Sequence, residues 1–201
     1  DGFALDAEGW RPRTEADLMR YCYHVAGAVG VMMALVMGVS RDDEDVLDRA
    51  CDLGFAFQLA NIARDIEEDD ANGRCYLPVR WLVLEDIEPG QHTKPHHRTE
   101  LADMANKLVL LMHQHAEASK LGAAKLPFRS RWAVLSATRI YTAIGHEVRA
   151  KREAATHALA EVFQENIKIF ARVHNTLAKE KEIEDRWRGM PTPETVRHLS
   201  N

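Results

Sequence analysis

Apolar residues recur along this chain at the spacing of helix faces, and almost no segment alternates between apolar and polar residues as a half-exposed strand would. The spacing predicts helices at about 14–38, 43–69, 78–85, 99–122, 129–149 and 153–184. The polar segment Asp86–Thr99 contains two prolines and a glycine, and it separates two helical halves without requiring a domain boundary. We therefore predict an all-α fold that forms a single domain over residues 1–201, with a charged helix and a loosely held end over 150–201.

Residues at the expected helix ends support these boundaries. Thr14 followed by Asp17 has the pattern of a capping box. Ser40 or Asp42 is expected to cap the next helix, because short polar side chains accept hydrogen bonds from the first free backbone N–H groups. The Asn-Gly dipeptide at 72–73 predicts the turn that ends that helix.

The composition excludes several classes of protein. A chain of 201 residues that is 46% hydrophobic can bury one substantial core. The net charge of −5, with both signs interspersed, argues against a nucleic-acid binder, which would show a basic patch. The cysteines show no C-x-x-C spacing, so neither a disulfide framework nor a zinc site is predicted, and small buried residues in a reducing cytoplasm are expected. No signal peptide is visible at the start.

An uncharged segment at 25–39 raises the question of membrane insertion. Its length falls short of the roughly 20 residues that span a bilayer, and His24 and Arg41 bracket it closely. We therefore predict a buried helix and leave peripheral membrane contact open. A row of small residues on this helix (Ala26, Gly30, Ala34 and Gly38) would let another helix or a long apolar ligand approach closely.

The most informative segment is "NIARDIEEDDANGRCYLP", residues 61–78, which carries five acidic residues within six positions. An α-helix turns by about 100° per residue, so four polar residues near the end of this helix and one glycine lie within one angular sector of its surface, about 80° wide. The members of this sector, here called the α-stripe, are Gly54, Gln58, Asn61, Asp65 and Asp69. Much of the flanking surface is apolar.

Two carboxylates one turn apart repel each other, and burying them costs free energy unless a cation neutralises them. Mg²⁺ takes one or two carboxylates and leaves other positions to water and phosphate oxygens. Asp65 and Asp69 match that preference, and Asn61 can add an amide oxygen. Arg64 and Arg74 flank the carboxylates with positive charge that suits a diphosphate.

The alternative is an ordinary solvated helix end, since surface helices often carry acidic residues there despite the macrodipole. Asp48 and Asp52 also have the D-x-x-x-D spacing, but they lie on another face of the helix and are interpreted as surface charge. The histidines of the polar loop, such as His92, are not expected to form a metal site.

Two blocks of sequence resemble the squalene and phytoene synthase family, and its phytoene synthase branch most closely. They are "YCYHVAGAVGVMM" at 21–33 and "FQLANIARDIEEDDANGRCYLP" at 57–78, and the resemblance extends from about residue 1 to 148. It implies an isoprenoid-synthase (trans-prenyltransferase) helical bundle around a central cavity, in which two aspartate-rich helices hold Mg²⁺ against prenyl diphosphates. Asp65–Asp69 matches the second of these motifs, and no counterpart of the first is present, so an N-terminally incomplete enzyme is expected.

The resemblance also assigns individual residues. Tyr21, Val25 and Val29 match the helix that lines the prenyl channel, and with Met32 they follow the 4-4-3 spacing of one helix face. Tyr141 matches a tyrosine of the cavity. Residue chemistry and resemblance together assign catalysis to Asp65, Asp69, Tyr21 and Tyr141, substrate binding to Gln58, Asn61, Arg64, Arg74, Val25 and Val29, and metal binding to Asp65, Asp69 and Asn61. Plain core packing is the alternative for the tyrosines and valines.

The implied activity is head-to-head condensation of two geranylgeranyl diphosphates to phytoene through a cyclopropyl diphosphate, a step of carotenoid biosynthesis. The expected cofactor is Mg²⁺, for which Mn²⁺ could substitute. NADPH is not expected, since no G-x-G-x-x-G segment is present.

Two other functions stay open at this stage. A squalene or dehydrosqualene type of synthase would use farnesyl diphosphate in the same fold. A non-catalytic relative that acts as an assembly factor would explain the missing first motif, although it would not need the second. The expected partners are prenyl diphosphates, and no nucleic acid is expected. The expected location is the cytoplasm, and the oligomeric state is not indicated.

Overall fold

The computed structural model describes residues 2–126, 128, 130–132, 134–152, 154 and 179. The chain divides into two compact units, 1–156 and 157–201, and every described residue except Lys179 belongs to the first. We predicted a single domain over 1–201 and a helix over 153–184. Part of that domain and most of that helix lie outside the described residues, so both stay predictions.

The described residues form an all-α structure without a strand, as predicted. Its helices are α1 (Gly2–Ala7), α2 (Glu15–Cys22), α3 (Ala28–Val36), α4 (Glu44–Ala71), α5 (Val79–Leu84) and α6 (Arg98–Ala123). A π-helical turn, Tyr23–Gly27, joins α2 to α3, and a 3₁₀ turn, Pro95–His97, precedes α6. The described residues between 128 and 154 are also helical. The pattern analysis did not predict α1 or the π turn.

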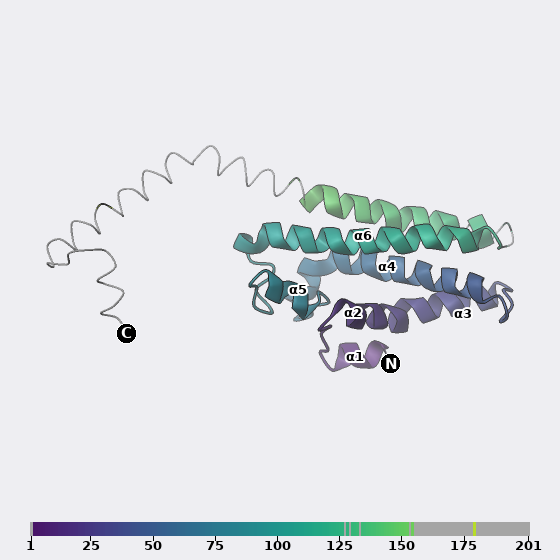
Figure 1. Ribbon diagram of the computed structural model, residues 1–201, viewed down its shortest axis with the longest axis horizontal. Helices are drawn as coiled ribbons and strands as arrows, with labels where there is room; N and C mark the ends of the chain where they lie inside the picture. The colour runs from purple at the N-terminus through teal and green to yellow at the C-terminus, as the bar shows by residue number, and fades with distance from the viewer. Residues whose placement is uncertain are drawn as a thin grey trace. The chain divides into compact units, whose positions relative to one another are not determined.

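Helix α4 is central to the first unit. Figure 1 shows α6 running beside α4 along its length, with α2 and α3 on the other side of α4 and α1 beyond them. The described helical residues after 128 run back beside α6 (Figure 1). A helix in this position needs apolar residues on more than one face, which the buried residues of α4 between Val46 and Ile66 provide.

One predicted cap is confirmed and one is wrong. The hydroxyl of Thr14 accepts the backbone N–H of Asp17 at 3.2 Å, and the Thr14 N–H donates to the Asp17 carboxylate at 3.0 Å, which completes the capping box. At the start of α4 the N-cap is Asp43, and its side chain makes no capping hydrogen bond. Ser40 does not cap α4, because its hydroxyl accepts the N–H of Asp42 at 3.3 Å within the preceding turn.

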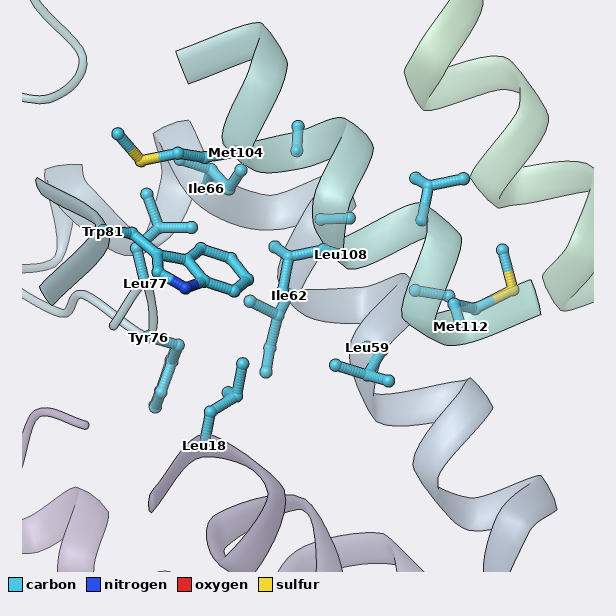
Figure 2. Packing of buried hydrophobic residues seen from close by; sticks show 14 of the residues in the cluster. Leu18, Leu59, Ile62, Ile66, Tyr76, Leu77, Trp81, Met104, Leu108 and Met112 are labelled. Carbon is cyan, nitrogen blue, oxygen red and sulfur yellow. The ribbon is translucent and has the colours of Figure 1, made fainter. Parts of the chain in front are cut away.

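The core is built mainly between α4 and α6. Figure 2 shows apolar side chains of the two helices in one cluster, to which Leu18 of α2 and Trp81 of α5 also contribute. The labelled α4 residues are Leu59, Ile62 and Ile66, and those of α6 are Met104, Leu108 and Met112 (Figure 2). Fully burying one such side chain stabilises the fold by about 1.5–3 kcal/mol, so this interface fixes α4 firmly.

Helix α4 contacts α3 and the π turn before it through glycines. A Cβ atom on Gly30 would overlap the carbonyl oxygen of Ala50, and one on Gly54 would lie 2.7 Å from the Cα atom of Gly27 and overlap the carbonyl of Ala26. The backbones of the two helices therefore approach as closely as the predicted row of small residues suggested. No flexible side chain lies at these contacts, so neither helix can accommodate an added methyl group without moving.

The apolar helix is less buried than predicted. The continuous stretch Glu15–Val36 is, among the described residues, long and apolar enough by length and composition to cross a membrane, but only 22% of its most apolar window is buried. Met32 is 55% exposed and Val36 is 80% exposed. The prediction of a buried helix is wrong for this face, because α4 covers only the opposite side of α3.

We predict that Gly54→Ala destabilises the protein by about 1–3 kcal/mol, because the new methyl group meets backbone atoms of the π turn that leads into α3. Intrinsic helix propensity alone would give the opposite sign, with a gain of up to about 1 kcal/mol. The midpoint of urea unfolding measures the difference. A variant as stable as the parent or more stable would show that α3 and α4 do not approach in this way.

Candidate functional site

A cavity of about 470 Å³ lies between α3, α4, the end of α6 and the helical segment around residue 137. Its walls are largely apolar, with Val25 and Val29 on one side and Leu53 and Phe57 on another. Such a largely apolar space suits a long hydrocarbon chain. Val25 and Val29, which were predicted to line a prenyl channel, do line this cavity.

The α-stripe connects the cavity to the acidic end of α4. Gly54, Gln58 and Asn61 line the cavity, and the two amides are polar groups in an otherwise mainly apolar wall. Asp65 and Asp69 continue the stripe beyond the lining residues, one and two turns farther along the helix. Because a helix rises about 1.5 Å per residue, Asp69 lies about 12 Å from Asn61 along the axis. A ligand with an apolar tail and an anionic head would match this order of surfaces if a cation lay between the head and the carboxylates.

Arg64 is paired with Asp65 in this structure. Its Nε and Nη2 atoms donate to the two carboxylate oxygens, each at 2.6 Å, in a bidentate pair. This hydrogen bonding to Asp65 raises the pKa of Arg64. The guanidinium predicted to bind a diphosphate is therefore beside the stripe, and it neutralises one of its two carboxylates.

Asp69 lies in an excess of negative charge. Burial is the main cause that raises the pKa of its carboxyl, and the charge of Asp65 is the next. Glu68 and Asp6 raise it further, while Arg74 lowers it. The backbone N–H of Arg74 also donates to the Asp69 carbonyl oxygen at 2.8 Å, so the arginine predicted at this site lies next to the carboxylate. A bound cation would relieve this crowding of charge.

The donor set fits one side of a Mg²⁺ site. Asp65 and Asp69 offer carboxylate oxygens from one helix, and Asn61 offers an amide oxygen one turn earlier. Within the part of the chain that the structure describes, no three carboxylate, imidazole or thiol groups converge closely enough to hold a metal ion by themselves. Mg²⁺ commonly keeps several water or phosphate ligands, so an incomplete protein shell is compatible with it.

The two tyrosines assigned to catalysis have different surroundings. Tyr141 lines the cavity and stacks on Phe57, with ring centroids 3.9 Å apart and an interplanar angle of 17°. Tyr21 is 3% exposed and is not among the residues that line the cavity. Its hydroxyl donates to Asp6 at 2.9 Å.

The π turn explains the separation of Tyr21 from the valines. Its hydrogen bonds reach one residue farther than those of an α-helix, as in the bond from the N–H of Ala28 to the carbonyl oxygen of Tyr23. The 4-4-3 face drawn through Tyr21, Val25 and Val29 assumed a regular α-helix and does not hold across this turn. Burial first, and hydrogen bonding second, raise the pKa of Tyr21 far above its ordinary value, which disfavours proton transfer from its hydroxyl.

Sequence reasoning missed a contact between the polar loop and the acidic end of α4. His92 is 1% exposed, its Nε2 atom lies 3.7 Å from the Asp70 carboxylate, and the Thr93 hydroxyl donates to the same carboxylate. Burial lowers the pKa of His92. The loop is therefore attached to the residue that follows Asp69, and nothing in the spacing of its histidines indicated this.

A second correction concerns Asp52, which was interpreted as surface charge. Its side chain is 13% exposed, pairs with Arg49 at 3.2 Å and lies 2.7 Å from the Nδ1 atom of His115 on α6. Asp48 is exposed, as predicted. The helix angles correctly separated Asp52 from the α-stripe, but they did not show that α6 covers that face.

Comparison with known sequences shows the family to which this chain is similar. A family model described as squalene/phytoene synthase matches residues 1–170. The chain is 48% identical over 147 residues to the 15-cis-phytoene synthase of Enterobacter agglomerans. The aligned region covers 73% of this chain and 49% of that protein. It is 49% identical over 150 residues to the phytoene synthase of Pseudescherichia vulneris, covering 75% and 48%. The chain thus spans about half the length of the curated relatives it matches.

Comparison with solved structures supports the fold. The squalene synthase HpnC from Alicyclobacillus acidocaldarius superposes with a TM-score of 0.67 at 21% sequence identity, covering 76% of this chain and 57% of the other. A dehydrosqualene synthase in complex with a ligand gives a TM-score of 0.63 at 24% identity, covering 78% and 62%. The all-α fold predicted from sequence is therefore that of these isoprenoid synthases. From the match over residues 1–170 and the shared fold, this chain belongs to the squalene/phytoene synthase family.

Proposed function

We propose that this chain carries the prenyl-binding cavity and one aspartate-rich motif of a phytoene synthase, which condenses two geranylgeranyl diphosphates head to head. The observation that carries the proposal is the α-stripe, on which cavity-lining amides lead directly to a pair of carboxylates. The similar proteins described as phytoene synthases support the substrate class.

The cavity residues would hold and shield the hydrocarbon chains. Apolar walls exclude water, which would otherwise quench an allylic cation. The stacked faces of Phe57 and Tyr141 can stabilise positive charge in the cavity through their π systems. Gln58 and Asn61 can orient the polar end of a donor, because their amides lie between the apolar wall and the carboxylates.

The acidic end would hold the diphosphates. Mg²⁺ bound by Asp65 and Asp69, with Asn61 as a further donor, supplies stabilisation of the charge that develops on the leaving diphosphate oxygens. Arg64 and Arg74 add positive charge beside it, and Arg64 can exchange its bond to Asp65 for one to a diphosphate.

The proposed reaction balances without a reductant. Loss of one diphosphate and one proton joins the two donors as a cyclopropyl diphosphate. Loss of the second diphosphate, rearrangement of the carbon skeleton and release of a second proton then give phytoene. Since no hydride is added, NADPH is not needed.

The predicted cytoplasmic location and peripheral membrane contact stay predictions, and the exposed apolar face of α3 is compatible with such contact.

Product analysis tests the substrate. With Mg²⁺, we expect the protein to form a C40 hydrocarbon from geranylgeranyl diphosphate and to form little C30 hydrocarbon from farnesyl diphosphate, in chromatography of extracted products. A C30 product alone would contradict the proposal and support the dehydrosqualene type of synthase. No hydrocarbon from either donor, together with no Mg²⁺ binding, would support the assembly-factor hypothesis.

We predict that Asp65→Ala lowers kcat by roughly two to three orders of magnitude or more, because it removes a charged group that acts on the departing diphosphate. Helicity measured by far-UV circular dichroism should not change, because the Asp65 side chain is partly exposed. Asp48→Ala, on the same helix and exposed, is the matched control with parental turnover expected. Near-parental turnover of Asp65→Ala would remove Asp65 from its assigned role.

Thermal unfolding tests the metal site without turnover. At one hundred times its dissociation constant, Mg²⁺ should stabilise the protein by about 2.7 kcal/mol, which corresponds to a rise in Tm of roughly 5–10 °C. We expect Asp69→Asn to abolish this rise. Without Mg²⁺, the variant should be at least as stable as the parent at neutral pH, since it carries one fewer charge near Asp65 and Glu68. An undiminished response to Mg²⁺ would exclude Asp69 as a ligand.

A further inference from the structure

Asp6, on α1, accepts hydrogen bonds from two tyrosines that are distant in sequence. The Tyr21 hydroxyl donates to its Oδ1 and Oδ2 atoms at 2.9 and 3.2 Å. The Tyr76 hydroxyl donates to the same Oδ1 atom at 2.8 Å. A carboxylate is an acceptor with two oxygens, so one side chain satisfies both phenols.

The same tyrosines form a stack of aromatic rings. Trp10 lies on Tyr21 with ring centroids 5.5 Å apart, and Tyr21 lies on Tyr76 at 5.0 Å, with interplanar angles of 24° and 21°. Tyr21 is 3% exposed and Tyr76 is 9% exposed. Without Asp6, the two largely buried hydroxyls would lose the acceptor that they share, and a buried hydroxyl left without a partner destabilises the fold.

Tyr76 connects this stack to the acidic end of α4. Only six residues separate it from Asp69, and the turn between them passes through Gly73, whose φ is +73°. Within that turn, the Arg74 N–H donates to the Asp69 carbonyl oxygen. Asp69, Arg74 and Tyr76 also line one small cavity of about 10 Å³. The position of the Tyr76 ring therefore limits where Arg74 and the backbone at Asp69 can lie.

We propose that Asp6 is a positioning residue for this site: by holding Tyr21 and Tyr76 in one stack, its carboxylate fixes residues 72–77, and with them Arg74, beside Asp69. Its effect on catalysis rests on the proposed function, whereas its effect on residues 72–77 does not. Asp6 does not line the 470 Å³ cavity, so it acts through the tyrosines rather than on the substrate tail.

Hydrogen exchange measured by mass spectrometry tests the structural part on the protein itself. In Asp6→Ala, we expect amides in residues 72–77 to exchange roughly tenfold faster or more, because buried hydroxyls lose their acceptor. Amides of α6 should not change. Asp6→Asn should restore slow exchange, since its single amide oxygen can accept both hydroxyls that now donate to Oδ1. Glu8→Ala, an exposed position just beyond α1, is the matched control.

Tyr76→Phe provides the same test with a smaller change, because it removes one hydroxyl and keeps the stacked ring. It should accelerate exchange in residues 72–77, and it decides the question if Asp6→Ala does not fold. Unchanged exchange in Tyr76→Phe and Asp6→Ala, or exchange in Asp6→Asn as fast as in Asp6→Ala, would overturn the proposal.

The Mg²⁺ dependence of turnover tests the functional part. We expect Asp6→Ala to raise the Mg²⁺ concentration for half-maximal activity by roughly tenfold or more, as loss of a group that orients metal ligands does, and Asp6→Asn to restore it. Faster exchange with an unchanged Mg²⁺ requirement would make Asp6 only a stabilising contact and would overturn its role at the site. If the parent protein shows no turnover, the proposed function fails, and the exchange experiment still decides whether Asp6 fixes residues 72–77.

Discussion

The close approach of α3 and α4 is the constraint on which the cavity depends. Where Gly30 and Gly54 meet backbone atoms of the opposing helix, no side chain separates the two elements, and both glycines belong to the cavity wall. The apolar contacts between α4 and α6 then hold α4 from its other side. Contacts on both sides set the rotation of α4 about its axis, and this rotation places Gln58 and Asn61 of the α-stripe at the cavity.

The charges at the end of α4 follow from the same arrangement. Helix α4, whose middle is buried, carries a cluster of acidic residues at its C-terminal end, where the macrodipole opposes them. Arg64 satisfies Asp65, whereas Asp69 has a raised pKa because of burial and neighbouring carboxylates. Such an imbalance is costly in a structural helix, but it suits a site that takes up cations and their anionic ligands.

Sequence patterns predicted the longer helices α4 and α6 and the order of residues on the α-stripe, because both depend on the period of a single helix. The Thr14 capping box and the glycine turn at Gly73 could be predicted for the same reason, since each is a local signal. Contacts between distant segments could not be predicted in this way. Nothing near Asp6 or His92 in sequence indicates Tyr76 or Asp70 as a partner. The π turn was missed because its sequence is compatible with a regular helix.

That turn lets the two halves of one helix adopt independent rotational settings. Tyr21 on the first half fits the aromatic stack, while Gly30 on the second fits the crossing with α4. In a regular helix the two would be locked to a common phase, and a shift of one residue turns a side chain by about 100°. Deleting one residue of the π turn would restore a regular helix, in which the ring stack and the glycine crossing could not both form. The irregular turn therefore lets one continuous helix contribute both to the aromatic stack beside the acidic end and to the wall of the cavity.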